Sequence, residues 1–312
     1  MKIFEHDFGN ATAEERKLLD SYFRGYDYRG AEFTFLSIYV WRHEFSASWD
    51  IIEGYLCIAY DPSAELGRGY MMIPLTCDGT YEPKKLRAAV EKCREIFAAK
   101  GYDLAIGLVP GHMRHFLEDA FPEEEIKWLH DVNNDQYVYE KEKLITLSGR
   151  ALHKKKNHLN YFLRTYDFES KIVTESMKSD ILDLVERLKE VKEADPDEIE
   201  DLEGETEAIE NFLSHLGEPG VYSTAIFVGG KLEAFALGER LSGDTAVEHF
   251  EKADGVYRGL YQLVCREFCM ALPDETVYVN REEDMGLANL RQAKEALAPC
   301  RMEERYTWLL SK

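Results

Sequence analysis

Residues 222–252 contain the pattern that most restricts the fold of this chain, three strand-like runs separated by glycine-containing turns. The runs and turns are, in order, 222–228, Gly229-Gly230, 232–241, Ser242-Gly243-Asp244 and 245–252. A Gly-Gly pair between two such runs is typical of a tight β-hairpin, because glycine adopts positive φ angles without steric cost. The sequence therefore predicts an antiparallel three-stranded meander.

The elements around this meander predict the same order in both halves of the 312-residue chain. In the first half we expect helices, a meander at 45–75, a helix at 83–99, a strand at 104–109, a helix at 112–120 and a strand at about 134–145. In the second half we expect helices at 150–166 and 177–193, the meander, a helix at 257–271, a strand at 276–280, a helix at 287–297 and a closing strand at about 302–310. Because domains of about 150 residues are common, we expect two α+β domains, 1–145 and 146–312.

Charge and cysteine content exclude several classes of protein. The formal net charge of −21 argues against nonspecific binding to DNA or to an anionic membrane. The six cysteines include no CxxC pair; Cys265 and Cys269 share a helix face without a histidine pair, so we expect buried free thiols. No apolar run approaches the roughly 18 residues that span a bilayer, and the first residues do not resemble a signal peptide. These features predict a reduced, cytoplasmic protein.

The run at 245–252 carries the first candidates for catalysis. Strict alternation places His249 and Glu251 on one face of a strand, and Glu248 and Lys252 on the other. A carboxylate can orient an imidazole, so the His249–Glu251 pair is a candidate general base, and Glu248 is its rival on the opposite face. The alternative is a set of buried polar groups that neighbouring strands satisfy, or a solvated sheet face.

A helix start follows the break at Asp254-Gly255. Free backbone N–H groups and Arg258 in the first turn suit phosphate or pyrophosphate, and Gly259 would let a ligand approach the backbone closely. Helix starts that contain glycine are common, so an ordinary structural turn is the alternative.

The strand near 277–280 ends in a charged loop. Tyr278 and Asn280 share one face of this strand, and the loop after it leads to Arg291 on the next helix. The alternative is a solvated loop in which Asp284 is a cap and Glu282 and Glu283 face water.

Residues 150–164 form a basic tract without a single acid, which is unusual in so acidic a chain. Its apolar residues recur at helical spacing, so we expect a helix with one positive face. The basic candidates are Lys154, Lys155, Lys156 and Arg164. They could bind the phosphates of RNA, a nucleotide or a lipid headgroup, or they could contact the acidic segment 193–210 of the same chain. No nucleotide-hydrolysis, serine-hydrolase, zinc-protease or dinucleotide motif is present, so we predict no metal site.

Several short motifs together resemble one bacterial family. They are Phe33-Thr34-Phe35 with Tyr39-Val40-Trp41-Arg42, Asn157-His158-Leu159-Asn160, the 248–253 run EHFEKA, the 259–262 run GLYQ, the 280–286 run NREEDMG and the 290–294 run LRQAK. The chain is similar over essentially its whole length to uncharacterised proteins related to the C-terminal domain of phosphatidylglycerol lysyltransferases.

This resemblance implies two tandem domains of the GCN5-related N-acyltransferase fold, arranged as in peptidoglycan aminoacyl transferases, with terminal strands that can be exchanged between the halves. Relatives transfer an aminoacyl group from transfer RNA to an amine or a lipid hydroxyl. The acyl-coenzyme A signature of the fold is only partly matched, by Arg258-Gly259 and Tyr261. The resemblance therefore implies acyl-coenzyme A or aminoacyl-tRNA as donor, without choosing between them.

These observations lead to one hypothesis and one alternative. The hypothesis is an acyl- or aminoacyl-transferase in which Glu248, or His249 with Glu251, accepts the proton of an amine and Tyr278 protonates the leaving group. The candidates for donor binding are Lys252, Tyr257, Arg258, Gly259, Tyr261, Asn280, Arg281 and Arg291. The alternative is a non-catalytic binding or interaction protein that retains the acyltransferase fold.

Overall fold

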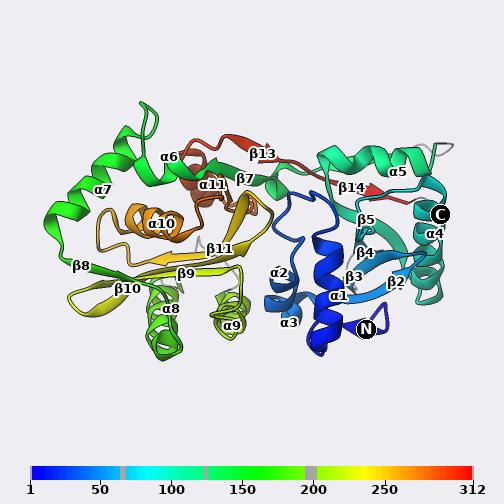
Figure 1. Ribbon diagram of the computed structural model, residues 1–312, viewed down its shortest axis with the longest axis horizontal. Coiled ribbons are helices and arrows are strands. Elements are labelled where there is room, and N and C mark those ends of the chain that lie inside the picture. Colours follow the sequence, from blue (N-terminus) through cyan, green and yellow to red (C-terminus); the bar gives the residue numbers. More distant parts are fainter. Residues whose placement is uncertain (1, 64–67, 123–125, 194–201, 311–312) are drawn as a thin grey trace. The chain divides into compact units, whose positions relative to one another are not determined.

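The computed structural model describes residues 2–63, 68–122, 126–193 and 202–310 (Figure 1). The chain forms two compact units, one made of Met1–Gln136 with Glu303–Lys312 and the other of Tyr137–Met302. We call them the N-terminal unit and the C-terminal unit. Each has a seven-stranded mixed sheet flanked by helices, which agrees with the expected α+β class.

The N-terminal unit has the strand order β1-β2-β3-β4-β5-β14-β6. Among the described strands of this unit, β4 and β5 pair parallel. The strands are β1 (His6–Asp7), β2 (Ser48–Ile52), β3 (Tyr55–Ser63), β4 (Arg68–Met72), β5 (Asp103–Pro110), β6 (Trp128–His130) and β14 (Arg305–Leu309). The helices are α1 (Ala13–Phe23), α2 (Phe35–Val40), α3 (Arg42–Phe45), α4 (Pro83–Ala99) and α5 (Arg114–Ala120), with short 3-10 turns η1 (Gly111–Met113) and η2 (Val132–Asn134).

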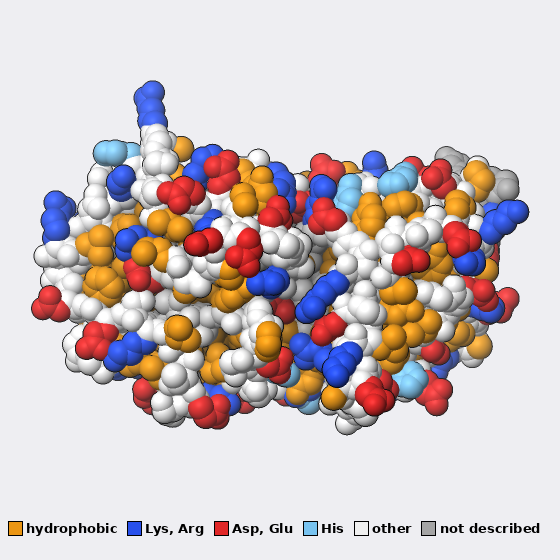
Figure 2. All heavy atoms as spheres, viewed as in Figure 1, with side chains coloured by type: hydrophobic (Ala, Val, Ile, Leu, Met, Phe, Trp, Pro, Cys, Tyr) orange, Lys and Arg blue, Asp and Glu red, His pale blue; other side chains and the backbone are white. Residues whose placement is uncertain are grey.

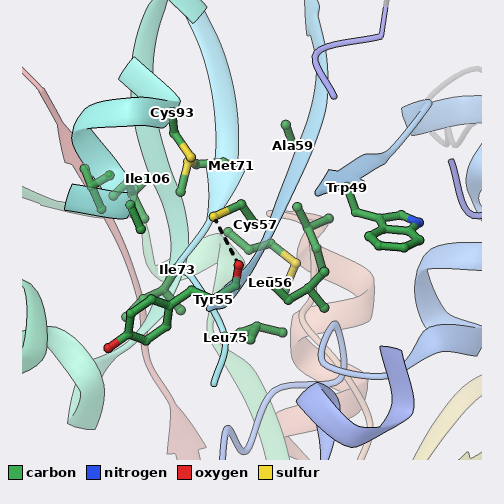
Figure 3. Close-up of a cluster of buried hydrophobic side chains, with 14 of the residues drawn as sticks. Trp49, Tyr55, Leu56, Cys57, Ala59, Met71, Ile73, Leu75, Cys93 and Ile106 are labelled. Carbon is green, nitrogen blue, oxygen red and sulfur yellow. Dashed lines mark hydrogen bonds between the residues drawn. The ribbon is translucent and has the colours of Figure 1, made fainter. Parts of the chain in front are cut away.

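The core of the N-terminal unit forms because apolar residues of α4 recur at helical spacing. Leu86, Val90 and Phe97 lie on one face of α4 and are fully buried. Figure 3 shows Cys57 and Cys93 among aliphatic side chains of this core. The expectation of buried free thiols is confirmed for these two and for Cys265 and Cys269, whereas Cys77 and Cys300 are exposed.

The C-terminal unit has the strand order β13-β7-β12-β11-β10-β9-β8. Its strands are β7 (Gln136–Glu140), β8 (Phe168–Lys171), β9 (Val221–Val228), β10 (Lys231–Arg240), β11 (Thr245–Ala253), β12 (Tyr278–Asn280) and β13 (Arg301–Glu303). Its helices are α6 (Lys141–Thr146), α7 (His153–Thr165), α8 (Lys178–Glu193), α9 (Leu202–Leu213), α10 (Leu260–Ala271) and α11 (Ala288–Glu295), with the 3-10 turn η3 (Glu175–Met177).

The predicted meander is confirmed as β9, β10 and β11, paired antiparallel. Gly229 and Gly230, at φ 60° and 83°, make the hairpin turn in the way that a Gly-Gly pair predicts. Helix α10 packs on one face of this meander, and α8 and α9 lie on the other (Figure 1). The sheet is therefore covered on both faces, and its central strands are buried.

Each sheet includes one strand whose residues were expected to belong to the other half of the chain. Strand β14, from the C-terminal end, lies between β5 and β6 of the N-terminal unit, and β7 lies between β13 and β12 of the C-terminal unit. The compact units therefore do not follow the expected division into 1–145 and 146–312. The unit boundaries lie near residues 136 and 302, because β14 pairs in the N-terminal unit and β7 in the C-terminal unit.

Two local expectations also change. Residues 141–146, expected to extend a strand, form α6, and the helix expected from residue 257 begins at Leu260. The acidic stretch 193–210 lies partly outside the described residues, and its described part forms most of α9.

Candidate functional site

A β-bulge in β11 organises the candidate site. Opposite β10, Leu237 pairs with Phe250 but Gly238 pairs with Glu248, so His249 is an extra residue in β11. Only glycine fits at position 238, because a Cβ there would lie 2.1 Å from the Val247 carbonyl oxygen. The bulge shifts the alternation of side chains by one position.

Because of this shift, Glu248 and Glu251 face the same side of the sheet, toward α10. Both contact Arg281, which follows β12: its Nε donates to Glu248, and its Nη2 lies 2.8 Å from Glu251 Oε2. The expected grouping of His249 with Glu251 is wrong for this reason. A bulge breaks the strict period of two on which that expectation rests.

The electrostatics of Glu248 differ from those of an ordinary ion-paired carboxylate. Burial is the largest effect and raises the pKa of Glu248 to about 8; the Arg281 charge opposes this, and Glu251 adds to it. Two carboxylates share one guanidinium in a place where little water can screen them, so the cluster favours retaining a proton. Among the described residues, Glu248 Oε1 has no hydrogen-bond partner.

Arg281 lies where two strands of the sheet separate. β12 pairs parallel with β11 only from Thr245–Tyr278 to Val247–Asn280, and beyond Val247 strand β11 has β10 on one side and none of the described strands on the other. The Arg281 guanidinium also lies 6.0 Å from the centre of the Tyr139 ring.

Cys265 of α10 completes the cluster. Its thiol and the carboxylates of Glu248 and Glu251 lie within 4.8 Å of one another, a spacing that could hold a cation. The Arg281 guanidinium already supplies positive charge to both carboxylates, so the donor set is better explained as a buried ion-pair cluster.

His249 lies on the opposite face of the sheet, 5.9 Å by ring centroid from Phe212 of α9. Its Nδ1 is 2.7 Å from Glu282 Oε1 and its Nε2 is 3.1 Å from Glu239 Oε1. Burial alone would lower the pKa of His249, but hydrogen bonds to these two carboxylates raise it to about 10. A buried imidazole with both nitrogens engaged is not a free general base.

Tyr278 and Asn280 share a face of β12, as expected, but this face is turned away from Glu248. Val279, between them, pairs with Ala246, and both belong to the core against α10. Tyr278 packs instead under Arg301, 4.4 Å from its ring centre, and the Asn280 side chain accepts from the Glu282 N–H. The structure does not bring Tyr278 to the Glu248 carboxylate.

The predicted donor residues around the start of α10 are partly engaged by α7. A Cβ on Gly259, at φ 97°, would lie 2.2 Å from the His158 carbonyl oxygen, so this glycine admits the backbone of α7 rather than a ligand. Arg258 is exposed and lies over the Tyr161 ring at 5.1 Å. Tyr257 packs edge-on against Tyr166. Tyr261 is 43% exposed.

Two further donor candidates pair with acids of the C-terminal unit. Lys252 Nζ lies 2.6 Å from Glu205 of α9. Arg291 binds the buried Asp284 through Nε at 2.7 Å and Nη2 at 2.8 Å, and the Tyr137 hydroxyl donates to the same carboxylate. These ion pairs make Lys252 and Arg291 structural in the geometry observed.

The basic helix is α7, which packs against α10. Lys154, Lys156 and Arg164 are exposed, and several Lys and Arg side chains appear over α7 in the view of Figure 2. Lys155 is half-buried; burial, followed by the charges of Arg281 and Lys154, lowers its pKa, and Glu251 opposes this. Lys155 therefore lies near enough to the Glu248 cluster to sense its charges.

Sequence reasoning missed the two carboxylates that hold His249. Glu239 is one of two buried acids of β10, the other being Glu233, and nothing in the sequence of that strand sets it apart. Glu282 was expected to face water, and the sequence does not indicate its contact with His249, because His249 belongs to another strand.

The chain belongs to the family described as phosphatidylglycerol lysyltransferase, C-terminal, whose model matches residues 23–308. Among curated proteins, an uncharacterised protein of Mycoplasmoides gallisepticum is 24% identical over 182 residues. That match spans 58% of this chain and 58% of the relative, less than two thirds of its length.

Solved structures support the fold. A conserved protein of unknown function from Bacteroides thetaiotaomicron is 27% identical over 100% of both chains, with a TM-score of 0.87. FemX has a TM-score of 0.68 at 8% identity over 96% of both chains, and L-PGS of Bacillus licheniformis has 0.64 at 10% identity over 99% of this chain and 94% of that chain.

The same likeness extends, at a TM-score of 0.50, to a tandem GNAT protein from the clavulanic acid pathway that is 12% identical over 96% of this chain and 97% of that one. The expected tandem acyltransferase-like fold and the family resemblance are thus confirmed. None of the helices in the described part of the chain has the length and apolarity needed to cross a bilayer.

Proposed function

We propose that this protein transfers an acyl or aminoacyl group to an amine, with Glu248 as the proton acceptor. The observation that carries the proposal is the state of Glu248. It is buried beside Glu251 and Arg281, its pKa is raised to about 8, and its Oε1 has no hydrogen-bond partner among the described residues. A carboxylate whose pKa lies near neutral pH is suited to general acid–base catalysis.

The donor would lie along the free edge of β11. Beyond Val247 this edge has no neighbouring strand among those described, so its backbone groups can pair with an extended donor. The phosphates of acyl-coenzyme A or of aminoacyl-tRNA would lie toward Arg258 and the exposed lysines of α7. The description of the family as a lysyltransferase supports an aminoacyl donor, and the acceptor proposed is an amine.

The reaction forms an amide and breaks the ester or thioester of the donor. The acceptor nitrogen attacks the carbonyl carbon, and Glu248 takes one proton from that nitrogen. The proton can then return to the leaving oxygen or sulfur, so Tyr278 is not needed as an acid. Arg281 would stabilise the negative charge that develops on the carbonyl oxygen.

The test measures binding first and turnover second. Thermal unfolding of the full chain is followed with acetyl-coenzyme A and with charged transfer RNA, and then label transfer to an amine acceptor is assayed. We expect stabilisation by one donor and transfer that Glu248→Gln reduces by about 10²–10⁴-fold, the usual contribution of a general base. Glu275→Gln, which alters a largely exposed acid, is the matched control.

The second candidate is a binding protein that retains the fold without the chemistry. The ion pairs of Lys252 with Glu205 and of Arg291 with Asp284 favour it, because two donor-binding candidates are occupied. Stabilisation by a donor without any transfer would support this candidate. No stabilisation and no transfer would refute the transferase proposal for these donors.

A further inference from the structure

The residues that follow β12 contact both faces of β11. On the α10 face, Arg281 contacts Glu248 and Glu251. On the other face, the next residue, Glu282, contacts His249. Backbone pairing between β11 and β12 ends one residue earlier, at Asn280. Two adjacent side chains thus connect the strands just where their hydrogen bonds stop.

The backbone at Glu282 is unusual and is held by several contacts. Its φ is 58°, in the left-handed region that non-glycine residues rarely adopt. Its N–H donates to Asn280 Oδ1 at 2.8 Å, and its carbonyl accepts from the Tyr137 N–H at 3.1 Å. Such a conformation persists only where surrounding contacts determine it, and it is common at functional sites. It directs the side chains of 281 and 282 to opposite faces.

His249 provides the side-chain contact on that face. Each ring nitrogen lies within hydrogen-bond distance of a carboxylate oxygen, and a carboxylate can only accept. Both nitrogens must therefore carry protons, which makes the ring a cation between two anions. The side chain is 2% exposed, so water cannot replace either acceptor.

We propose that His249 is a positioning residue: as a doubly protonated ring bound to Glu239 and Glu282, it fixes residues 280–282 so that Arg281 bridges Glu248 and Glu251. His249 acts through Arg281 and does not touch the acceptor or the donor. The functional importance of this arrangement rests on the proposed role of Glu248. The positioning itself is a property of the resting protein and can be tested without any activity.

Charged groups surround His249 on one face of β11 and Glu248 on the other. On the His249 face they are Glu239 of β10, Glu282 of the loop, and the Lys252–Glu205 pair between β11 and α9. Lys294 of α11 adds a cation at the loop itself, where its Nζ donates to the Arg281 carbonyl at 2.6 Å. On the Glu248 face they are Glu251, Arg281, the Cys265 thiol of α10 and Lys155 of α7. A change at Glu282 removes one of the first set and leaves every member of the second set in the sequence.

The first experiment observes the ring directly. The full chain is labelled with ¹⁵N-histidine, and the His249 signals are assigned by their loss in His249→Gln. We expect both ring nitrogens to remain protonated from pH 6 to pH 9. A neutral tautomer at pH 8 would overturn the proposal, because one of the two carboxylates would then lack a donor.

The second experiment measures whether the contact at Glu282 controls Glu248. The titration of Glu248 is followed by NMR of ¹³C-labelled glutamate carboxyls, assigned with Glu248→Gln. Glu282→Ala removes the acceptor for His249 and should release Arg281. Because Arg281 lowers the proton affinity of Glu248, we expect that affinity to rise by about tenfold, one pKa unit.

Two comparisons exclude a merely structural effect. Glu282→Gln keeps an oxygen acceptor for Nδ1–H, so it should restore the wild-type titration of Glu248. Glu275→Ala removes an acid that lies before β12, away from the bulge, and should leave that titration unchanged. Thermal unfolding checks that Glu282→Ala and wild type are both folded. If Glu248 then titrates identically in the two proteins, the positioning proposal is refuted. An absence of transferase activity would refute only the proposed function.

Discussion

Gly238→Ala is the substitution that tests the bulge most sharply, because the new methyl group would meet main chain. The added Cβ would lie 2.1 Å from the Val247 carbonyl oxygen and 2.7 Å from Phe268 Cζ. Carbon atoms in contact prefer about 3.5–4.0 Å, so β10 and β11 would have to separate by more than about 1 Å. Neither a carbonyl nor the buried Phe268 ring can rotate away cheaply. The bulge at His249 would be lost or displaced.

The cost follows from this overlap. Overpacking a buried site by one methyl group usually costs about 1–3 kcal/mol, and we expect the upper end because a backbone atom must move. At about 2–4 °C per kcal/mol for a domain of this size, 3 kcal/mol lowers the Tm of the C-terminal unit by about 6–12 °C.

The assay is calorimetric unfolding of the full chain, in which the two units can melt separately. Gly243→Ala is the matched control, because a Cβ there meets nothing within 4 Å and its φ is not positive. The control should stay within about 0.5 kcal/mol of wild type. If Gly238→Ala is as stable as Gly243→Ala, the bulge does not depend on a glycine and the packing argument is wrong.

Two other substitutions give predictions through pH. The folded-state pKa of Glu248, about 8, lies above its ordinary 4.5, so wild type loses stability as pH rises from about 4.5 to 8. In urea titrations, Glu248→Gln should therefore become progressively more stable relative to wild type over this pH window. A stability difference that does not change with pH would contradict the raised pKa. Arg291→Ala should destabilise the fold at pH 7, because it leaves the buried Asp284 carboxylate without its guanidinium partner. Burial acts to raise the pKa of Asp284, but hydrogen bonds from Arg291 and Tyr137 lower it to about 2, so this pair stabilises the fold above pH 3.8 and the stabilisation is lost as pH falls toward 2. The cost of Arg291→Ala should shrink in that acid range, and a cost independent of pH would contradict the pairing.

Much of the fold is predictable because its signals are local. Gly229-Gly230 predicted the hairpin, and the pattern of residues 83–99 predicted the helix α4. The placement of β14 and β7 is a long-range pairing, and nothing within 302–310 or 134–145 identifies their partners. The family resemblance, rather than local pattern, indicated that terminal strands can be exchanged.

Sequence reasoning assigned the candidate residues to the strands that carry them but placed some on mistaken faces. Glu248, His249 and Arg281 were all singled out, yet strict alternation grouped His249 with Glu251. The signal that corrects it is Gly238, an isolated glycine inside a strand pattern, which often marks a bulge. The partners of His249 are Glu239 of β10 and Glu282 of the loop after β12. They meet only when three strands and this loop are placed together, so only the structure could show them.

The most direct measurement is the pH dependence of a single turnover. Labelled donor is bound to excess protein, and transfer is timed to an acceptor whose amine is uncharged from pH 6.5 to 9.5. We expect the wild-type rate to rise with an apparent pKa near 8 and then level off, because Glu248 must lose its proton to act as base. In Glu248→Gln the rate should be about 10²–10⁴-fold lower and independent of pH. A wild-type rate that does not change with pH, or a Glu248→Gln profile that matches wild type, would show that Glu248 is not the base.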